Sequence, residues 1–289
     1  PKGLAQPVFA DNTDTPGAGK AINDNNAWAR YVQRTVDRYK GKVQAWEIWN
    51  EPDFKPVEST AYFGFWSGTV AEYARLLKTA YLVIRATDPS ATVVIGGMAY
   101  WFQQDFFPRL LTAIRQDPQA AANGYYFDAT AWHWYSQPDL LYDRTVWVQQ
   151  TMERAGIRGK RVWITETDLP VCQDPPMKEK DIGCSQGTHR GTPQQQADFV
   201  LQALAYAYAA GVERVFLFQL YDDELGFGEY YGLVRNDGTA RPALQAAKLA
   251  ASLFQDITEA YRTTSARGRL DLLTFVTSDP RRIRLLWSR

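Results

Sequence analysis

Short apolar segments alternate with amphipathic segments of helical period along most of this 289-residue chain. This alternation predicts a parallel sheet covered by helices. Strands that are apolar along their whole length are typical of sheets buried on both faces. The predicted strands are Val43–Trp49, Thr92–Met98, Phe127–Tyr135, Arg161–Thr165 and Arg214–Leu220. The predicted helices are Asn23–Lys40, Val70–Thr87, Phe106–Gln116, Leu140–Ala155, Pro193–Ala210 and Pro242–Phe254.

Both a closed (β/α) barrel and an open doubly wound sheet fit this order. No G-x-G-x-x-G motif follows a predicted strand, which disfavours a dinucleotide-binding sheet. A full barrel has eight βα units over about 250 residues. We therefore expect an α/β fold, a (β/α)8 TIM barrel that lacks its first two βα units, with Leu4–Ala10 as the end of a third strand. On this count residues 1–257 form an N-terminally incomplete barrel.

The last part of the chain changes character. Arg269–Thr277 and Arg282–Ser288 alternate like paired strands around the turn Ser278–Pro280. We expect residues 258–289 to begin an antiparallel, β-sandwich-like accessory domain. A barrel without its first strands would have unpaired sheet edges and an exposed apolar flank. A protein of this sequence is therefore expected to be unstable or to aggregate.

Charge and composition narrow the classes of partner. Lys plus Arg and Asp plus Glu both number 32, so the formal net charge is zero. A neutral chain has no general attraction to nucleic acid or to anionic membranes. No apolar run reaches the roughly 18 residues of a membrane span, and the polar start does not resemble a signal peptide. The 10 Trp and 16 Tyr residues suit the faces of sugar rings, so we expect a carbohydrate partner.

The chain has two cysteines, Cys172 and Cys184, in a stretch rich in Pro, Asp and Gly. They are either unrelated thiols or a disulfide that staples a long loop. A disulfide would indicate an oxidising compartment, so we expect a secreted or extracytoplasmic protein. With only His133 and His189 as histidines and no C-x-x-C motif, a zinc site is disfavoured.

The segment Trp49–Pro52 (WNEP) follows a predicted buried strand. Barrel enzymes carry catalytic groups at the carboxyl ends of their strands. A carboxylate in that position is partly desolvated, which raises its pKa toward the range of a general acid. Glu51 is therefore a candidate general acid, and Asn50 can bind a ligand hydroxyl group. The alternative is an ordinary turn with a solvated glutamate.

Glu166 occupies the same kind of position at the end of Arg161–Thr165, three βα units further along the chain. Two carboxylates that face one cavity can cleave a glycosidic bond. One protonates the leaving oxygen, and the other attacks the anomeric carbon or activates water. For a retaining enzyme we expect Glu51 and Glu166 to be about 5–5.5 Å apart.

The stretch Glu47–Phe54 (EIWNEPDF), followed three units later by Val162–Asp168 (VWITETD), resembles the retaining glycoside hydrolases of clan A. These enzymes are (β/α)8 barrels with the acid/base at the end of strand 4 and the nucleophile at the end of strand 7. Val83–Pro89, Val93–Ala99 (VVIGGMA) and Tyr230–Ala246 are most similar to family 39. That family contains β-xylosidases and endo-acting exopolysaccharide hydrolases. The resemblance spans about residues 40–255.

The resemblance implies that Glu51 is the acid/base, that Glu166 is the nucleophile and that Asn50 binds the sugar 2-hydroxyl. It also implies that Tyr135 donates a hydrogen bond to the nucleophile. His133 lies two residues before Tyr135, so both point to the same side of their strand. Core packing is the alternative for each of them. No metal or organic cofactor is implied.

Other candidate substrate-binding residues lie at or beyond strand ends. They are Trp101, Trp134, Tyr221 and Asp222. Many clan members have a Trp after strand 8, whereas this chain has Tyr221 in that region, and Thr167–Pro170 matches no single family. For each of these residues taken alone, another role fits as well as substrate binding does. That role is packing in the core or, for Asp222, a place in a solvated loop.

These patterns together predict a retaining glycoside hydrolase that cleaves a β-linked oligo- or polysaccharide by double displacement. A transglycosylase would use the same two carboxylates. A non-catalytic carbohydrate-binding barrel would retain the fold without turnover. In an open α/β protein both glutamates would be surface groups, more than about 10 Å apart.

Overall fold

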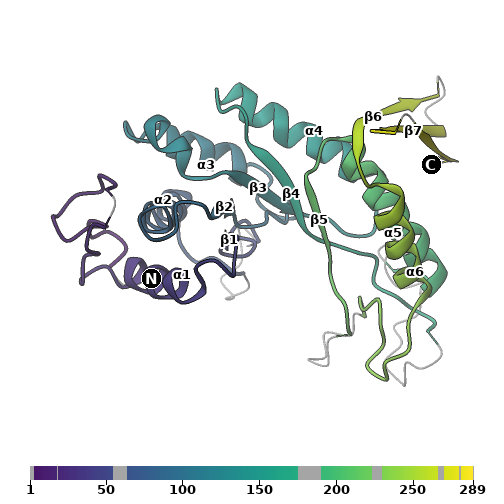
Figure 1. Cartoon of the computed structure of the whole chain (residues 1–289), viewed down its shortest axis with the longest axis horizontal. Coiled ribbons are helices and arrows are strands. Elements are labelled where there is room, and N and C mark those ends of the chain that lie inside the picture. The colour runs from purple at the N-terminus through teal and green to yellow at the C-terminus, as the bar shows by residue number, and fades with distance from the viewer. Residues whose placement is uncertain are drawn as a thin grey trace. The chain divides into compact units, whose positions relative to one another are not determined.

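The computed structural model describes residues 3–17, 19–54, 64–174, 190–222, 230–265, 270–279 and 281–288. The chain forms two compact units. The first consists of Pro1–Trp132 and Gln150–Arg161, and the second of His133–Gln149 and Val162–Arg289. Figure 1 follows the elements along the chain by label and colour.

Five strands form one sheet in the order in which they occur in the chain. They are β1 (Ala45–Ile48), β2 (Thr92–Ile95), β3 (Ala129–His133), β4 (Arg161–Thr167) and β5 (Arg214–Leu217). β1 pairs with β2, β2 with β3, and β4 with β5, all in parallel. At least one helix separates each strand from the next. Sequential parallel order with helical crossovers confirms the expected partial (β/α) barrel.

Four helices of the described residues lie entirely in the first unit, and the first two of them begin at side-chain caps. They are α1 (Ala27–Tyr39), α2 (Val70–Thr87), α3 (Phe106–Arg115) and the 3₁₀-helix η1 (Ala121–Tyr126). Asn26 accepts a 3.0 Å hydrogen bond from the Ala29 N–H at the start of α1. Thr69 and Glu72 form a capping box at the start of α2. α2 packs against both α1 and α3 (Figure 1). Its Leu76 and Leu77 side chains are completely buried.

The helices of the second unit begin within one residue of the predicted positions. α4 (Asp139–Arg154) starts in this unit, and its last residues belong to the first unit. α5 (Pro193–Ala209) has a Thr192–Gln195 capping box, and α6 (Pro242–Leu253) also begins with proline. α5 and α6 lie side by side (Figure 1). Within the described residues, no helix combines the length and the apolar character needed to cross a membrane.

A three-stranded antiparallel sheet follows α6, in the order β6 (Ile257–Thr264), β7 (Leu270–Thr277) and β8 (Arg282–Ser288). The β7–β8 pairing confirms the hairpin predicted from alternation. β6 was not predicted. Tyr206 of α5 links the sheet to the helix, because its hydroxyl donates to Asp271 at 2.6 Å and accepts from the Trp287 indole at 2.7 Å.

The expectation that Leu4–Ala10 ends a third strand is wrong. This segment makes only an isolated antiparallel bridge, between Phe9 and Ile22. Side-chain amides take the place of a neighbouring strand, since Asn26 donates to the Gln6 carbonyl and Asn23 donates to the Pro7 carbonyl. Turns on either side also interrupt an extended path. The larger apolar residues that suggested a strand, Leu4, Val8 and Phe9, are buried within this loop.

Candidate active site

Glu51 lies in a sharp turn directly after β1. Trp49 and Glu51 both have positive φ angles, 76° and 40°, so the strand ends at Ile48 rather than at Trp49 as predicted. The Glu51 N–H donates to the Gly97 carbonyl at 3.0 Å, which holds the turn against the end of β2. Glu51 is half-buried, and Asn50 is exposed. Positive φ angles are uncommon for residues other than glycine, and such strained backbone clusters at functional sites.

A buried tyrosine and a glycine join the ends of β1 and β2. The Tyr73 hydroxyl donates to the Ile48 carbonyl at 2.8 Å and accepts from the Gly96 N–H at 2.9 Å. Burial raises the pKa of Tyr73, which keeps this hydroxyl neutral. A Cβ at Gly96 would lie 2.6 Å from the carbonyl oxygens of both Ile48 and Trp49. Only glycine therefore allows the two strand ends to approach this closely.

Asp53 anchors the turn that carries Glu51. Its carboxylate is fully buried and accepts the Ala99 N–H at 2.9 Å and the Tyr100 N–H at 2.7 Å. Burial raises the pKa of Asp53 to about 6, the two backbone donors oppose this shift, and the charge of Glu51 adds to it. One side chain thus ties the loop after β1 to the loop after β2.

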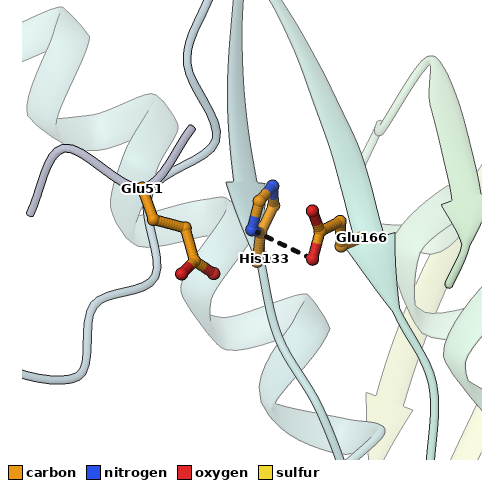
Figure 2. A group of neighbouring side chains, drawn as sticks. All are labelled: Glu51, His133 and Glu166. Atoms are coloured by element: carbon orange, nitrogen blue, oxygen red, sulfur yellow. Dashed lines mark ion pairs between the residues drawn. The ribbon is translucent and has the colours of Figure 1, made fainter. Parts of the chain in front are cut away.

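In the second unit, Glu166 is held by two side chains from the end of β3 and its continuation. The Tyr135 hydroxyl donates to Glu166 Oε2 at 2.6 Å. Nδ1 of His133 lies 3.5 Å from the same oxygen, and the two side chains point toward one another in Figure 2. Nε2 of the buried His133 lies 3.0 Å from the Thr165 hydroxyl. The imidazole is therefore fixed from both of its nitrogen atoms.

β4 continues through Thr167, two residues beyond the predicted end, and Glu166 lies inside it. Ile164 pairs with Val215 and Thr167 with Leu217, so β4 has one more residue than β5 over this stretch. Such a bulge redirects side chains and is frequent beside active sites. The bulge contains Thr165 and Glu166, the residues that contact His133.

The ring of Tyr135 is set by neighbouring aromatic side chains. Its centroid lies 5.3 Å from that of Tyr231 and 6.3 Å from that of Phe218. Phe218 and Tyr231 also contact each other, at 5.6 Å. This packing limits the rotation of Tyr135 and aims its hydroxyl at Glu166.

Asp168 follows Glu166 by two residues and is completely buried. Burial raises its pKa well above the ordinary value, opposed by the Leu169 N–H, the Gln196 amide and Arg241. The Leu169 N–H donates at 2.7 Å, and the Gln196 amide donates at 3.3 Å. Gln196 also donates to the Tyr231 carbonyl. The loop after β4 is thereby attached to α5 and to the segment that carries Tyr231.

A buried ion-pair network underlies the loop after β5. Arg241 forms two 2.8 Å hydrogen bonds with Asp222 and one with Asp174. Arg235 also binds Asp174, at 2.6 Å. Burial alone would raise the pKa of Asp174, but Arg235 and Arg241 hold it below the ordinary value. The Gly232 N–H also donates to Asp222. Asp222 thus has a structural ion pair, and its role in sugar binding stays a prediction.

The predicted site residues are distributed over both units. Asn50, Glu51 and Trp101 belong to the first, and His133, Trp134, Tyr135, Glu166, Tyr221, Asp222 and Cys172 to the second. Of these, the structure brings His133, Tyr135 and Glu166 into one group. The separation of the Glu51 and Glu166 carboxyl groups stays a prediction. Cys172 is fully buried, and Cys184 lies outside the described residues.

The residues of this region that were not predicted include Asp53, Thr165, Asp168 and Arg241. Asp53 and Asp168 had a signal in the sequence, because each follows a candidate catalytic glutamate by two positions. Thr165 and Arg241 had none, since their contacts depend on pairings that are distant in sequence.

Comparison with known proteins supplies the context for these residues. The model of the family described as "Glycosyl hydrolase catalytic core" matches residues 21–247. A search of curated proteins gives no match.

Solved structures share the fold at low sequence identity. A family 39 glycoside hydrolase from the gut symbiont Bacteroides cellulosilyticus is 18% identical, with a TM-score of 0.63 over 94% of this chain and 54% of its own. A monomeric β-xylosidase from Caulobacter crescentus is 17% identical, with a TM-score of 0.56 over 93% and 55%. An α-L-arabinofuranosidase from Thermotoga maritima is 14% identical, with a TM-score of 0.54 over 89% and 60%. The chain spans little more than half the length of these proteins.

Proposed function

The chain belongs to the family of glycosyl hydrolase catalytic cores, and we propose that it is a retaining glycosidase that cleaves β-glycosidic bonds of an oligo- or polysaccharide. The observation that carries this proposal is the group formed by Glu166, Tyr135 and His133 at the ends of parallel strands. Catalytic groups of barrel enzymes are found at such strand ends. A carboxylate held there by a hydroxyl and an imidazole is a suitable nucleophile.

In the proposed reaction Glu166 attacks the anomeric carbon while Glu51 protonates the departing oxygen. The bond to the leaving group breaks, and a covalent glycosyl-enzyme forms at Glu166. Glu51 then removes a proton from the attacking water, which releases the sugar with its original anomeric configuration. The Tyr135 hydroxyl bonds to one oxygen of Glu166, which leaves the other oxygen for attack on carbon.

Substrate contacts are proposed for Asn50, Trp101, Trp134 and Tyr221. Asn50, Trp101 and Tyr221 are exposed in the segments that follow β1, β2 and β5, where ligand groups can reach them. We also propose that the β6–β8 sheet begins an accessory domain, because it has its own antiparallel pairing. We further propose that Cys172 and Cys184 form a disulfide, which would indicate a secreted location.

The proposal is tested by sugar release from aryl β-glycosides and a panel of polysaccharides. Glu51→Gln and Glu166→Ala should each lower kcat by about 10³-fold or more, because each removes a group that takes part in the proposed reaction. A loss of that size corresponds to an increase of about 4 kcal/mol in the activation free energy. Glu153→Gln and Glu259→Ala, at exposed glutamates of the first and second units, are the matched controls.

The first-formed product distinguishes the related functions. Nuclear magnetic resonance should show the β-anomer before mutarotation, as a double displacement requires. Transfer to added sugar in preference to water would indicate a transglycosylase. Sugar binding without turnover, unaltered by both glutamate variants, would overturn the enzyme in favour of a carbohydrate-binding barrel.

A further inference from the structure

Four aromatic side chains are exposed on the two loops that follow β1 and β2. The exposed fractions are 38% for Trp49, 52% for Phe65, 45% for Trp101 and 43% for Phe102. A group of exposed aromatic side chains that lie close together often marks a binding surface, whereas a single exposed apolar residue does not. We call these four residues the aromatic platform.

Two further rings contact the platform. Phe54 lies 5.4 Å from Phe65 and 4.9 Å from Phe102, between ring centroids. Trp66 is buried and contacts Trp49 edge-on at 5.4 Å. The Trp49 indole donates to the Phe65 carbonyl at 2.9 Å. Rings held in this way lose little conformational freedom when a ligand stacks on them.

The platform shares its loops with Glu51. Trp49 precedes Glu51 by two residues, and the Phe54 N–H donates to the Glu51 carbonyl at 3.0 Å. Trp101 and Phe102 follow Tyr100, whose N–H is bound by Asp53. The same backbone contacts that fix the proposed acid/base therefore fix the platform.

The chemistry of the described residues on these loops favours an uncharged ligand. Residues 49–54, 64–69 and 96–105 include Glu51, Asp53 and Asp105 but no lysine or arginine. Glu51 repels an anionic sugar, and the pairing of Asp105 with Arg109 of α3, at 3.1 Å, adds no net positive charge to these loops. Aromatic faces bind the apolar C–H faces of neutral sugar rings, whose hydroxyl groups remain free for polar contacts such as Asn50.

We propose that the aromatic platform binds the leaving-group part of a neutral β-linked glycan, beyond the bond that is cleaved. This inference rests on the proposed function, because Glu51 defines the leaving-group side as the acid that protonates the departing oxygen. Several exposed rings provide contacts for more than one sugar residue. The preferred substrate is then an oligomer or polymer rather than a sugar with a small leaving group.

The test compares Phe65→Ala/Phe102→Ala and Trp101→Ala with the wild-type protein. Tyr31→Ala is the control, since Tyr31 is 61% exposed on α1 of the same unit. Calorimetric binding of xylohexaose, cellohexaose and mannohexaose should weaken about tenfold in the platform variants, the effect of losing one or two aromatic contacts. Tyr31→Ala should bind like wild type. The anionic hexasaccharide of β-1,4-linked mannuronic acid, the charged counterpart of mannohexaose, should bind worst.

A second readout separates this inference from the proposed function. Two kcat/KM values are compared, one for the best neutral hexasaccharide and one for the corresponding β-glycosyl fluoride. In the platform variants the ratio of the first to the second should be about tenfold lower than in the wild-type protein, because a fluoride leaving group has no sugar ring that could stack on the platform. Hydrolysis with an unchanged ratio would overturn the platform and leave the glycosidase intact. Ring-dependent binding without hydrolysis would support the platform as a glycan-binding surface and overturn the glycosidase. Absence of hexasaccharide binding by the wild-type protein would overturn the platform.

Discussion

The hydroxyl of Tyr135 is 2.6 Å from Oε2 of Glu166, and it is the donor in this hydrogen bond. Tyr135→Phe keeps the ring against Phe218 and Tyr231 but removes the donor. A hydrogen bond to a charged group contributes about 1.5–3 kcal/mol, so kcat should fall about 10- to 100-fold with little change in the melting temperature. Steady-state kinetics and thermal unfolding measure the two effects. Tyr261→Phe, on the exposed face of β6, is the control, and wild-type kinetics for Tyr135→Phe would contradict the assigned role.

Asp53→Asn should change how stability depends on pH. The pKa of Asp53 is about 6 in the folded protein, against an ordinary value of 3.8. Between these pH values the unfolded chain loses the proton and the folded chain keeps it. Raising the pH through this window therefore lowers the free energy of unfolding, by about 3 kcal/mol at most.

The asparagine side chain does not titrate, so this slope should be absent from the variant. Asparagine also accepts only one of the two backbone N–H groups, which should destabilise the protein by about 1–3 kcal/mol at acid pH. The deficit relative to wild type should shrink between pH 4 and pH 7.5, as measured by urea unfolding. Asp24→Asn, at an exposed position, is the control. Parallel pH profiles for wild type and Asp53→Asn would refute this account.

Arg241→Met should be among the most damaging single changes in the second unit. The guanidinium group is fully buried and binds both Asp174 and Asp222. Its removal leaves buried carboxylates without their main partner, at a cost of about 3–5 kcal/mol. Arg281→Met removes an exposed ion pair with Asp279 and should cost less than about 1 kcal/mol. Equal melting temperatures for the two variants would show that the network is not important for stability.

Gly96→Ala should separate the ends of β1 and β2. The added Cβ would lie 2.6 Å from two carbonyl oxygens, and backbone cannot move aside as a flexible side chain can. We expect a loss of stability of about 2–4 kcal/mol together with lower activity. Gly41→Ala has a positive φ but open space around the new Cβ, and it should cost only about 1–2 kcal/mol. Chemical denaturation of both variants distinguishes crowding from backbone strain.

Hydrophobic periodicity predicted the five parallel strands, the six longer helices and the β7–β8 hairpin. It succeeded where apolar residues have a regular spacing, both in a strand as buried as β3 and in the partly exposed strands β5 and β8. It missed β6, whose residues Thr258, Glu259 and Thr263 are polar and exposed, and whose pairing depends on β7. It wrongly placed a strand at Leu4–Ala10. A loop whose apolar residues are buried can have the same composition as a short strand.

Candidate site residues that belong to a sequence motif could be predicted. Residues whose position depends on contacts distant in sequence could not. Glu51 and Glu166 were found from their strand-end positions, and Tyr135 from the family resemblance. Asp53 and Asp168 were overlooked because acidic residues are ordinarily exposed. Their burial depends on N–H groups and an amide that the fold brings to them. Arg241 could not be inferred, since its partners lie 19 and 67 positions away.

The anchoring of the Glu51 turn by Asp53 and Tyr73 has a consequence for how this protein can change during evolution. The contacts that fix the turn are buried and involve backbone atoms, whereas Phe65, Trp101 and Phe102 are exposed on the same loops. Stability and the proposed substrate preference thus depend on different residues of the same two loops and of the helix between them. Mutational libraries at the exposed positions should retain folded protein in most members, so new glycan preferences can be selected there with few losses to misfolding.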